Sequence, residues 1–119
     1  MYEITIEDTF DAAHCLPDDK GNCKRLHGHT YRVQVRFRFA TLGPGGMAID
    51  FRKAKADLRA AIDIMDHHYM NELPEFSAQN PTAENVAKLI FDRIKRDQDS
   101  ISSVSVWETP TSCATYSED

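Results

Sequence analysis

The chain has 119 residues, of which 41% are hydrophobic and 28% charged, and its formal net charge is −5. This length and composition predict one globular domain over residues 1–119, and the chain holds no apolar run near the ~20 residues needed to cross a bilayer. The acidic balance argues against a general nucleic-acid binder, because phosphate binding needs a basic surface.

Alternating apolar residues predict two strands in the first third of the chain. Those nearest the N-terminus keep an even-numbered phase: Tyr2, Ile4, Ile6 and Phe10. This alternation predicts a strand over residues 2–14 that delivers His14 near its end; its phase is only approximate past Asp8, where a bulge would not be surprising. A polar loop over residues 15–26 separates it from a second, strictly alternating strand that is expected to reach about Thr41.

Helical spacing begins after a glycine-rich turn at residues 43–46. Asp50 suits an N-cap, and the apolar residues that follow recur at helical intervals: Ala54, Leu58, Ala61, Ile62 and Met65. We expect this helix to end near residues 66–68. A second helix is expected to begin around residues 80–82, with Pro81 in its first turn.

The last two elements are predicted to be strands, over residues 103–107 and 113–116, with a turn at Thr111-Ser112. The order strand, strand, helix, helix, strand, strand predicts an α+β fold, in which two amphipathic helices cover one face of a four-stranded antiparallel sheet (ββααββ). Such a sheet has two edges and one uncovered face, which favours pairing between copies of the chain.

Three histidines form a candidate metal site. His27 and His29 lie one residue apart at the start of the second strand, so the strand period of two places both imidazoles on one face. His14 supplies a third nitrogen if its strand pairs with the second one. Three histidines with an open fourth position are typical of a catalytic zinc site.

Cys23 lies four residues before His27 and has two interpretations that spacing leaves open. It is either a fourth ligand of a closed structural site or a thiol that Lys24, Arg25 and the metal acidify, available as a base. The basic residues around it favour an anionic small-molecule substrate. The odd number of cysteines, without a framework spacing, and the lack of a signal-like start at residues 1–10 favour the cytoplasm.

Two acidic positions complete the candidate chemistry. Asp66 precedes His67 at the end of the first helix, where a histidine is ordinary at a helix terminus but also suits a proton relay. Glu108 continues the row of Val104 and Val106, so its carboxylate is aimed at the side of the core residues. A ligand with an amidine-like edge would satisfy it there, and a strand-end glutamate that reaches water is the alternative.

Seven segments occur together and in a fixed order: Phe10-Asp11-Ala12-Ala13-His14, Cys23 through His27-Gly28-His29, Ile49-Asp50-Phe51, Leu58, Met65 through Asn71, Asn80 through Asn85, and Val106-Trp107-Glu108-Thr109. In combination, from about residue 2 to residue 117, they resemble the 6-pyruvoyltetrahydropterin synthase family, whose members share the tunnelling T-fold. The three residues between Cys23 and His27 are similar to the bacterial 6-carboxytetrahydropterin synthases of queuosine and 7-deazaguanine biosynthesis, whereas the pyruvoyl-forming branch has a longer gap.

The resemblance implies a zinc-dependent carbon–carbon lyase that converts 7,8-dihydroneopterin triphosphate to 6-carboxytetrahydropterin and releases acetaldehyde and triphosphate. It implies the following site residues: zinc ligands His14, His27 and His29; a thiolate base, Cys23; a proton relay, Asp66 with His67; a catalytic anchor of the pterin amidine edge, Glu108; and further substrate contacts, Thr109, Lys24 and Arg25. His68 has no role in the resemblance.

The chain departs from the family pattern at two places. Cys15 follows His14 where relatives often carry arginine, and the turn at residues 43–46 lacks an acidic residue often found there, so the contacts of the triphosphate stay open. The T-fold resemblance also implies that three subunits join sheets into a twelve-stranded barrel, that two trimers stack as a hexamer, and that pockets lie between subunits. Two alternatives are a pyruvoyl-forming synthase and a non-enzymatic zinc module that Cys23 closes.

Overall fold

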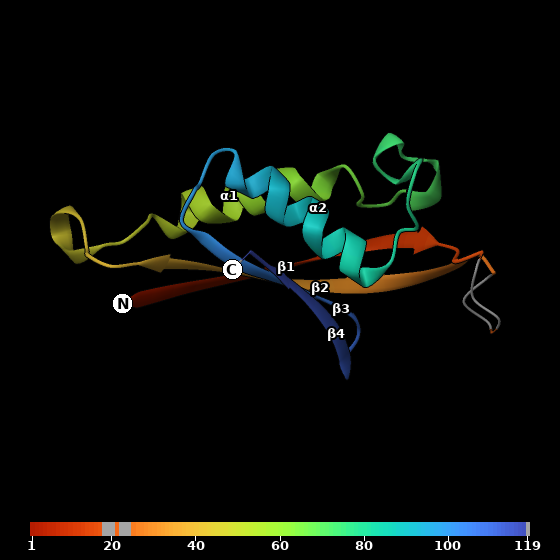
Figure 1. Cartoon of the computed structure of the whole chain (residues 1–119), viewed down its shortest axis with the longest axis horizontal. Coiled ribbons are helices and arrows are strands. Elements are labelled where there is room, and N and C mark those ends of the chain that lie inside the picture. The colour runs from red at the N-terminus through yellow and green to blue at the C-terminus, as the bar shows by residue number, and fades with distance from the viewer. Residues whose placement is uncertain (18–20, 22–24, 119) are drawn as a thin grey trace.

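Two helices lie on one face of a four-stranded antiparallel sheet in the computed structural model, which describes residues 1–17, 21 and 25–118 (Figure 1). The sheet order is β1-β2-β3-β4, and its strands are β1 (Tyr2–His14), β2 (His27–Phe39), β3 (Ile101–Thr109) and β4 (Ser112–Ser117). The helices are α1 (Phe51–Asp63) and α2 (Ala83–Lys95). The predicted element order and fold class are confirmed. Among the described residues, no helix has the length and apolar character needed to cross a membrane.

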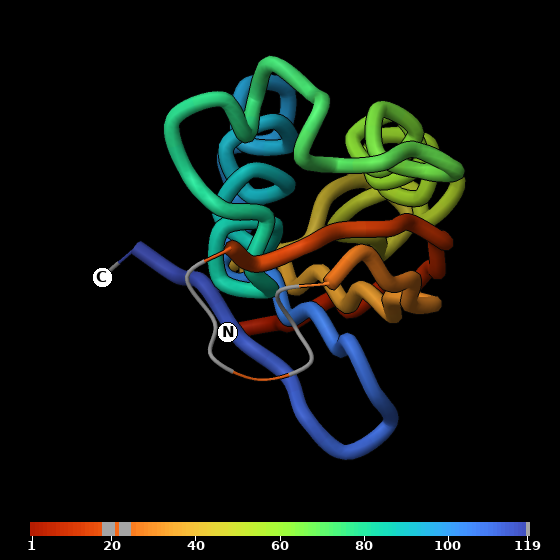
Figure 2. Tube along the Cα trace, turned by 90° about the vertical axis from the view of Figure 1, so that its right-hand side faces the viewer, coloured from red at the N-terminus to blue at the C-terminus, as the bar shows by residue number. Residues whose placement is uncertain are grey.

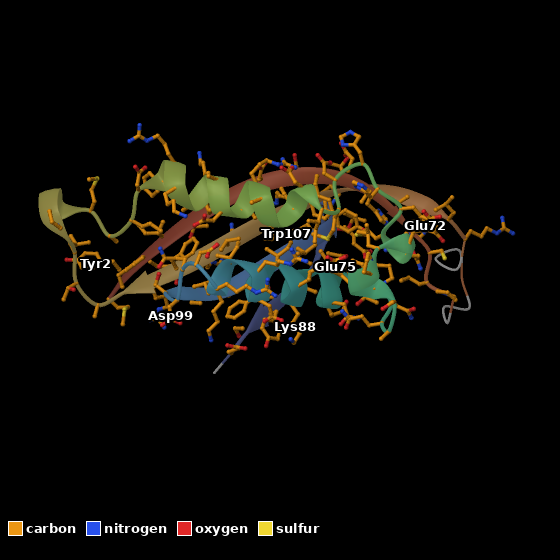
Figure 3. All side chains as sticks on the ribbon, turned by 90° about the horizontal axis from the view of Figure 1, so that it is seen from above. Tyr2, Glu72, Glu75, Lys88, Asp99 and Trp107 are labelled. Carbon is orange, nitrogen blue, oxygen red and sulfur yellow. The ribbon has the colours of Figure 1, made fainter. Side chains whose placement is uncertain are left out.

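The helix-covered face of the sheet forms the core. Seen from the end, both helices lie on the same side of the sheet, and the β3–β4 hairpin extends away from them (Figure 2). Seen from above, α1 and α2 run side by side along the strands (Figure 3). Inward-facing strand residues such as Phe10 and Tyr31, whose rings stack 4.8 Å apart, pack beneath buried helix residues such as Leu58 and Ile90. The burial of this apolar surface is the main favourable contribution to folding.

The β1–β2 ribbon keeps one register along its whole length, from Tyr2 opposite Phe39 to the two histidines at its other end. The pairing therefore has no bulge past Asp8, although the approximate sequence phase there left room for one. Asp8 stays in the inward phase, where Arg59 of α1 contacts it, with Nη1 3.3 Å from Asp8 Oδ2. The strand β2 also ends at Phe39 rather than near Thr41.

Both helix boundaries differ from the prediction for local reasons. The helix α1 ends at Asp63 instead of residues 66–68, since the backbone N–H groups of Met65 and Asp66 both donate to the carbonyl of Ile62 and tighten the last turn. The helix α2 begins at Ala83, after the Thr82 cap whose hydroxyl accepts from the backbone of the first turn. Pro81 therefore precedes the cap and does not lie in the first turn.

The segment after α1 pairs with the outer edge of β1. The N–H of His67 donates to the carbonyl of Asp11 (2.6 Å), and the N–H of Ala13 donates to the carbonyl of His68 (3.0 Å). Ala13 and Tyr69 form a parallel bridge. The prediction of two free sheet edges is thus wrong for this end of β1, because the chain itself covers it.

The uncovered face of the sheet carries three arginines of β2, which share it with Glu3 and Glu7 of β1: Arg32, Arg36 and Arg38. Arg36 Nε lies 3.9 Å from Glu3 Oε1, and Gln34 donates to Glu7 (2.7 Å). This face is therefore a row of mixed charges rather than a basic surface.

Candidate metal centre

The β1–β2 register brings the three predicted ligands together. His14 and His27 are direct partners across the two strands, and His29 follows on the same face of β2. The ring centroids lie 4.5 Å apart for His14 and His27, 5.1 Å for His14 and His29, and 4.8 Å for His27 and His29. One ring nitrogen from each histidine lies within 4.8 Å of the others, so the cluster has the size of a metal site.

Backbone carbonyls orient two of the three imidazoles. His14 is fully buried, and its Nδ1 lies 2.8 Å from the carbonyl oxygen of Pro81. His27 Nδ1 lies 2.7 Å from the carbonyl oxygen of Arg25. A carbonyl oxygen only accepts hydrogen bonds, so both Nδ1 atoms carry the proton and both Nε2 atoms present a lone pair. This is the usual second contact of a metal-binding histidine.

The two lone pairs converge. His14 Nε2 and His27 Nε2 lie 2.9 Å apart, a distance at which two unprotonated nitrogens repel each other unless a proton or a metal ion lies between them. Three imidazoles, two of them oriented by backbone carbonyls, match the ligands that divalent transition metals prefer. The residues present therefore fit a metal ion on chemical grounds.

Tyr31 packs against the histidine cluster. Its hydroxyl oxygen lies 3.2 Å from His14 Nδ1, and its ring lies edge-on to the rings of His14 and His29. Burial raises the pKa of the Tyr31 hydroxyl far above its ordinary value, so this group stays neutral. Neither Tyr31 nor Pro81 was among the predicted site residues. Pro81 gives no sequence signal, since its contribution is a backbone carbonyl.

Glu108 reaches the histidine cluster from β3. A register shift between Trp107 and Thr109 interrupts the β3–β4 pairing at this residue, and Glu108 Oε2 lies 3.9 Å from His29 Nε2. Burial lowers the pKa of His29, and the carboxylate of Glu108 partly offsets this effect. The structure thus places Glu108 on the side of the core residues, as its strand phase predicted.

Glu108 and Thr109 also line two neighbouring cavities of about 460 and 490 Å³. The first adjoins Arg32, whose guanidinium carbon lies 4.0 Å from the centre of the Trp107 ring. Arg25 contacts the cluster through its carbonyl. The predicted base Cys23 and the predicted substrate contact Lys24 lie outside the described residues.

Asp66 and His67 form a separate dyad on the edge of β1. His67 Nδ1 lies 3.0 Å from Asp66 Oδ1, and the His67 side chain is 77% exposed. Its φ of 60° is the one positive value at a non-glycine residue among the described positions. Such a conformation costs about 1–3 kcal/mol and persists where the surroundings enforce it, which is common at functional sites.

The Asp66 carboxylate is firmly ionised. Its Oδ1 accepts the backbone N–H of Asp11 (3.0 Å), and this bond, together with nearby His67 and Arg59, holds the pKa of Asp66 below its ordinary value. An open cleft of about 550 Å³ connects the dyad to the metal cluster, since both His67 and His29 line it. The structure therefore brings the predicted relay and the predicted metal site to one cleft.

The polar side chains Asn71 and Arg59 were missed by the sequence reasoning. The amide of Asn71 accepts from the N–H of Cys15 (2.8 Å) and donates to its carbonyl (2.9 Å), which holds the chain directly after His14. Arg59 of α1 contacts Asp66 and two other carboxylates. The spacing of Arg59 from Asp63, four residues on, was the one signal in the sequence for such a role.

The family model and similar proteins that are known agree on one protein family. The family model described as 6-pyruvoyl tetrahydropterin synthase matches residues 3–119. The chain is 37% identical over 141 residues to a 6-carboxy-5,6,7,8-tetrahydropterin synthase of Haemophilus influenzae, covering 99% of this chain and all of that protein. It is 38% identical over 122 residues to the protein of the same name from Synechocystis, covering 98% and 93%.

A solved structure agrees with the fold. The 6-pyruvoyl tetrahydropterin synthase of Caenorhabditis elegans is 28% identical, and its superposition on this chain has a TM-score of 0.88. The match covers 100% of this chain and 98% of the other. The helices, the sheet and their order are thus common to both proteins.

Proposed function

Because the chain belongs to the 6-pyruvoyl tetrahydropterin synthase family, we propose that it is a zinc-dependent 6-carboxy-5,6,7,8-tetrahydropterin synthase. The reaction would convert 7,8-dihydroneopterin triphosphate and one molecule of water to 6-carboxytetrahydropterin, acetaldehyde and triphosphate. The names of the H. influenzae and Synechocystis relatives support this product over the pyruvoyl compound.

The observation that carries the proposal is the converging pair of Nε2 lone pairs, 2.9 Å apart, on His14 and His27. His14, His27 and His29 would hold the zinc ion and leave a fourth position for substrate. When bound, zinc would supply Lewis acidity to the oxygens of the substrate side chain.

Proton transfer would be divided between two groups of this chain. The thiolate of Cys23 would remove one proton from the substrate side chain, since cysteine is an effective base near neutral pH once it is ionised. The Asp66–His67 dyad would move the second proton. The proximity of Asp66 Oδ1 to His67 Nδ1 (3.0 Å) supports this role, because it leaves His67 Nε2 available to the cleft.

Glu108 would position the pterin ring. A carboxylate at the edge of the cluster accepts two parallel hydrogen bonds from the amidine edge of a pterin, with Thr109 beside it. Its distance of 3.9 Å from His29 Nε2 supports a ring held next to the metal. Lys24 and Arg25 would attract the triphosphate. Glu108 thus fixes one end of the substrate while the histidine cluster fixes the other.

Product analysis of the zinc-loaded protein tests the proposal. Incubation with 7,8-dihydroneopterin triphosphate is expected to give 6-carboxytetrahydropterin, acetaldehyde and triphosphate in equal amounts. A His29→Ala protein is the matched control and is expected to be inactive. Release of triphosphate without acetaldehyde would instead make the chain a pyruvoyl-forming synthase, and no reaction with full zinc content would favour the non-enzymatic module.

The same proposal extends to assembly and pathway. Three chains would join their sheets, two such trimers would stack, and zinc and Cys23 of one chain would meet pterin contacts or relay groups of another. The exposure of His67, and the position of β4 at an edge of the sheet, support contacts of this kind. We place the product in queuosine and 7-deazaguanine biosynthesis and the enzyme in the cytoplasm.

A further inference from the structure

Arg59 occupies the junction between α1 and the edge of β1. Its Nε lies 2.7 Å from Asp63 Oδ1, its Nη1 lies 3.3 Å from both Asp8 Oδ2 and the carbonyl oxygen of Thr9, and its Nη2 lies 3.1 Å from Asp66 Oδ2. Every nitrogen of the guanidinium group thus has an oxygen partner. The planar fork is held in place by its own helix and by β1, and its remaining nitrogen, Nη2, faces Asp66.

The two oxygens of Asp66 have separate partners. Oδ2 accepts from Arg59, whereas Oδ1 accepts the backbone N–H of Asp11 and lies 3.0 Å from His67 Nδ1. The torsion that turns a carboxylate is broad and nearly two-fold, so these contacts decide which way the group faces. With Oδ2 fixed by Arg59, Oδ1 is turned toward the His67 ring.

We propose that Arg59 is a positioning residue, which holds Asp66 so that the neutral His67 ring carries its proton on Nδ1 and presents an unprotonated Nε2 to the cleft. An ionised carboxylate only accepts hydrogen bonds, so a correctly turned Oδ1 selects the Nδ1–H tautomer. The functional consequence rests on the proposed function, because a base at Nε2 matters only if the dyad moves a proton.

The backbone of the dyad supports the same conclusion. His67 has a φ of 60°, and its N–H donates to the carbonyl of Asp11. The Cα–Cβ bond therefore leaves the chain in one direction, and the 3.0 Å contact between Nδ1 and Asp66 Oδ1 orients the ring at its end. In this arrangement, Arg59 contributes through Asp66 and does not touch the reacting atoms itself.

Nitrogen NMR of the histidine rings tests the proposal on the zinc-loaded full-length protein. The two ring nitrogens of a neutral histidine differ clearly in chemical shift, so the spectrum reports the tautomer directly, and a His67→Gln protein assigns the signals. We expect the Nδ1–H form in the wild-type protein and a mixture of both tautomers in Arg59→Gln. The kcat of Arg59→Gln is expected to fall about tenfold with little change in KM, because a misplaced proton removes only a part of the rate enhancement that a general base provides.

Two matched variants separate positioning from structural support. Arg93→Gln removes an arginine of similar exposure, since the side chain of Arg93 is 31% exposed and that of Arg59 is 36% exposed. Nη2 of Arg93 lies 2.6 Å from Oε2 of Glu75, which lies against α2 (Figure 3). Asp63→Asn removes the negative charge of the α1 partner of Arg59 but leaves the contact with Asp66. Both variants are expected to keep the Nδ1–H tautomer.

The outcomes separate the two proposals. An unchanged tautomer in Arg59→Gln overturns the positioning role, as does an equal change in Arg93→Gln or Asp63→Asn. If Arg59→Gln changes the tautomer but the wild-type protein has no synthase activity, the positioning role is supported and the proposed synthase function is refuted. If Arg59→Gln does not fold, Arg59→Met is measured instead; it keeps an apolar side chain of similar length but offers no donor to Asp66, so an unaltered tautomer there also overturns the proposal.

Discussion

Replacing one of the three histidine ligands should separate the stability that zinc adds from the stability of the metal-free fold. His29→Ala is the cleanest such change, because His29 is 20% exposed whereas His14 is fully buried and also hydrogen-bonded to Pro81. Loss of the His29 ring costs some packing, about 1–2 kcal/mol, in the metal-free protein as well. Each protein is therefore compared with its own metal-free form.

The expected magnitude follows from linkage. Zinc at a thousand times its dissociation constant stabilises the native state by about 4.1 kcal/mol. A chain of 119 residues has an unfolding entropy of about 0.25 kcal/mol/K, so the wild-type Tm should rise by about 16 °C. One of four ligands supplies roughly 2.5–4 kcal/mol of the binding energy of a structural zinc site, so His29→Ala should bind about 10²–10³ times more weakly. At the same zinc concentration, its Tm should rise by only about 2–6 °C.

Thermal unfolding with and without zinc, at one fixed protein concentration, measures this difference. His68→Ala is the control, since its ring Nδ1 hydrogen-bonds the carbonyl of Asp66 and lies outside the cluster. It should retain the full shift. An equal shift in wild type and His29→Ala, or full zinc content after dialysis of the variant, would remove His29 from the ligand set and refute the argument from strand geometry.

Four further predictions concern the rest of the site. Cys23→Ala should retain zinc and lose exchange of substrate protons with deuterated solvent; loss of zinc together with activity would identify Cys23 as a ligand. His67→Ala should lower kcat more than it raises KM, and Glu108→Ala should chiefly raise KM, so identical kinetic profiles would contradict this division of roles. A mixture of inactive His29→Ala and inactive His67→Ala proteins should recover part of the activity if one pocket takes residues from two chains, whereas a fully active monomer by light scattering would exclude shared sites. Asn71→Asp loses the donor to the carbonyl of Cys15 and should weaken zinc binding by about tenfold, the lower range for groups that support metal ligands; unchanged zinc affinity by competition with a chelator would show that this clamp is dispensable.

Local patterns were sufficient to predict the fold class and one face of the site. The period of two is a property of any strand, so His27 and His29 had to share a face once β2 was recognised. The Asp50 cap and the helical spacing after it were likewise readable, because capping and amphipathicity act within a few residues. The position of Glu108 followed from its phase in β3.

The tertiary structure decided everything that depends on register or on distant partners. His14 faces His27 only because β1 and β2 pair without a bulge along their whole length, which the alternation within either strand does not settle. The carbonyl that orients His14 belongs to Pro81, 67 residues away in the chain. Such contacts leave no trace in composition or periodicity, since a backbone carbonyl is the same at every residue and its partner is chosen by packing.

At the Asp66–His67 dyad, too, the sequence indicated one part of the arrangement and the tertiary structure decided the rest. The sequence indicated that an aspartate adjoins a histidine at a helix end. It did not indicate that α1 stops at Asp63, that His67 adopts a positive φ, or that Arg59 and the backbone of Asp11 hold the carboxylate between them. Those features arise when the segment after α1 meets the edge of β1, because hydrogen bonds between groups far apart in sequence form only once the packed core has brought the two segments together.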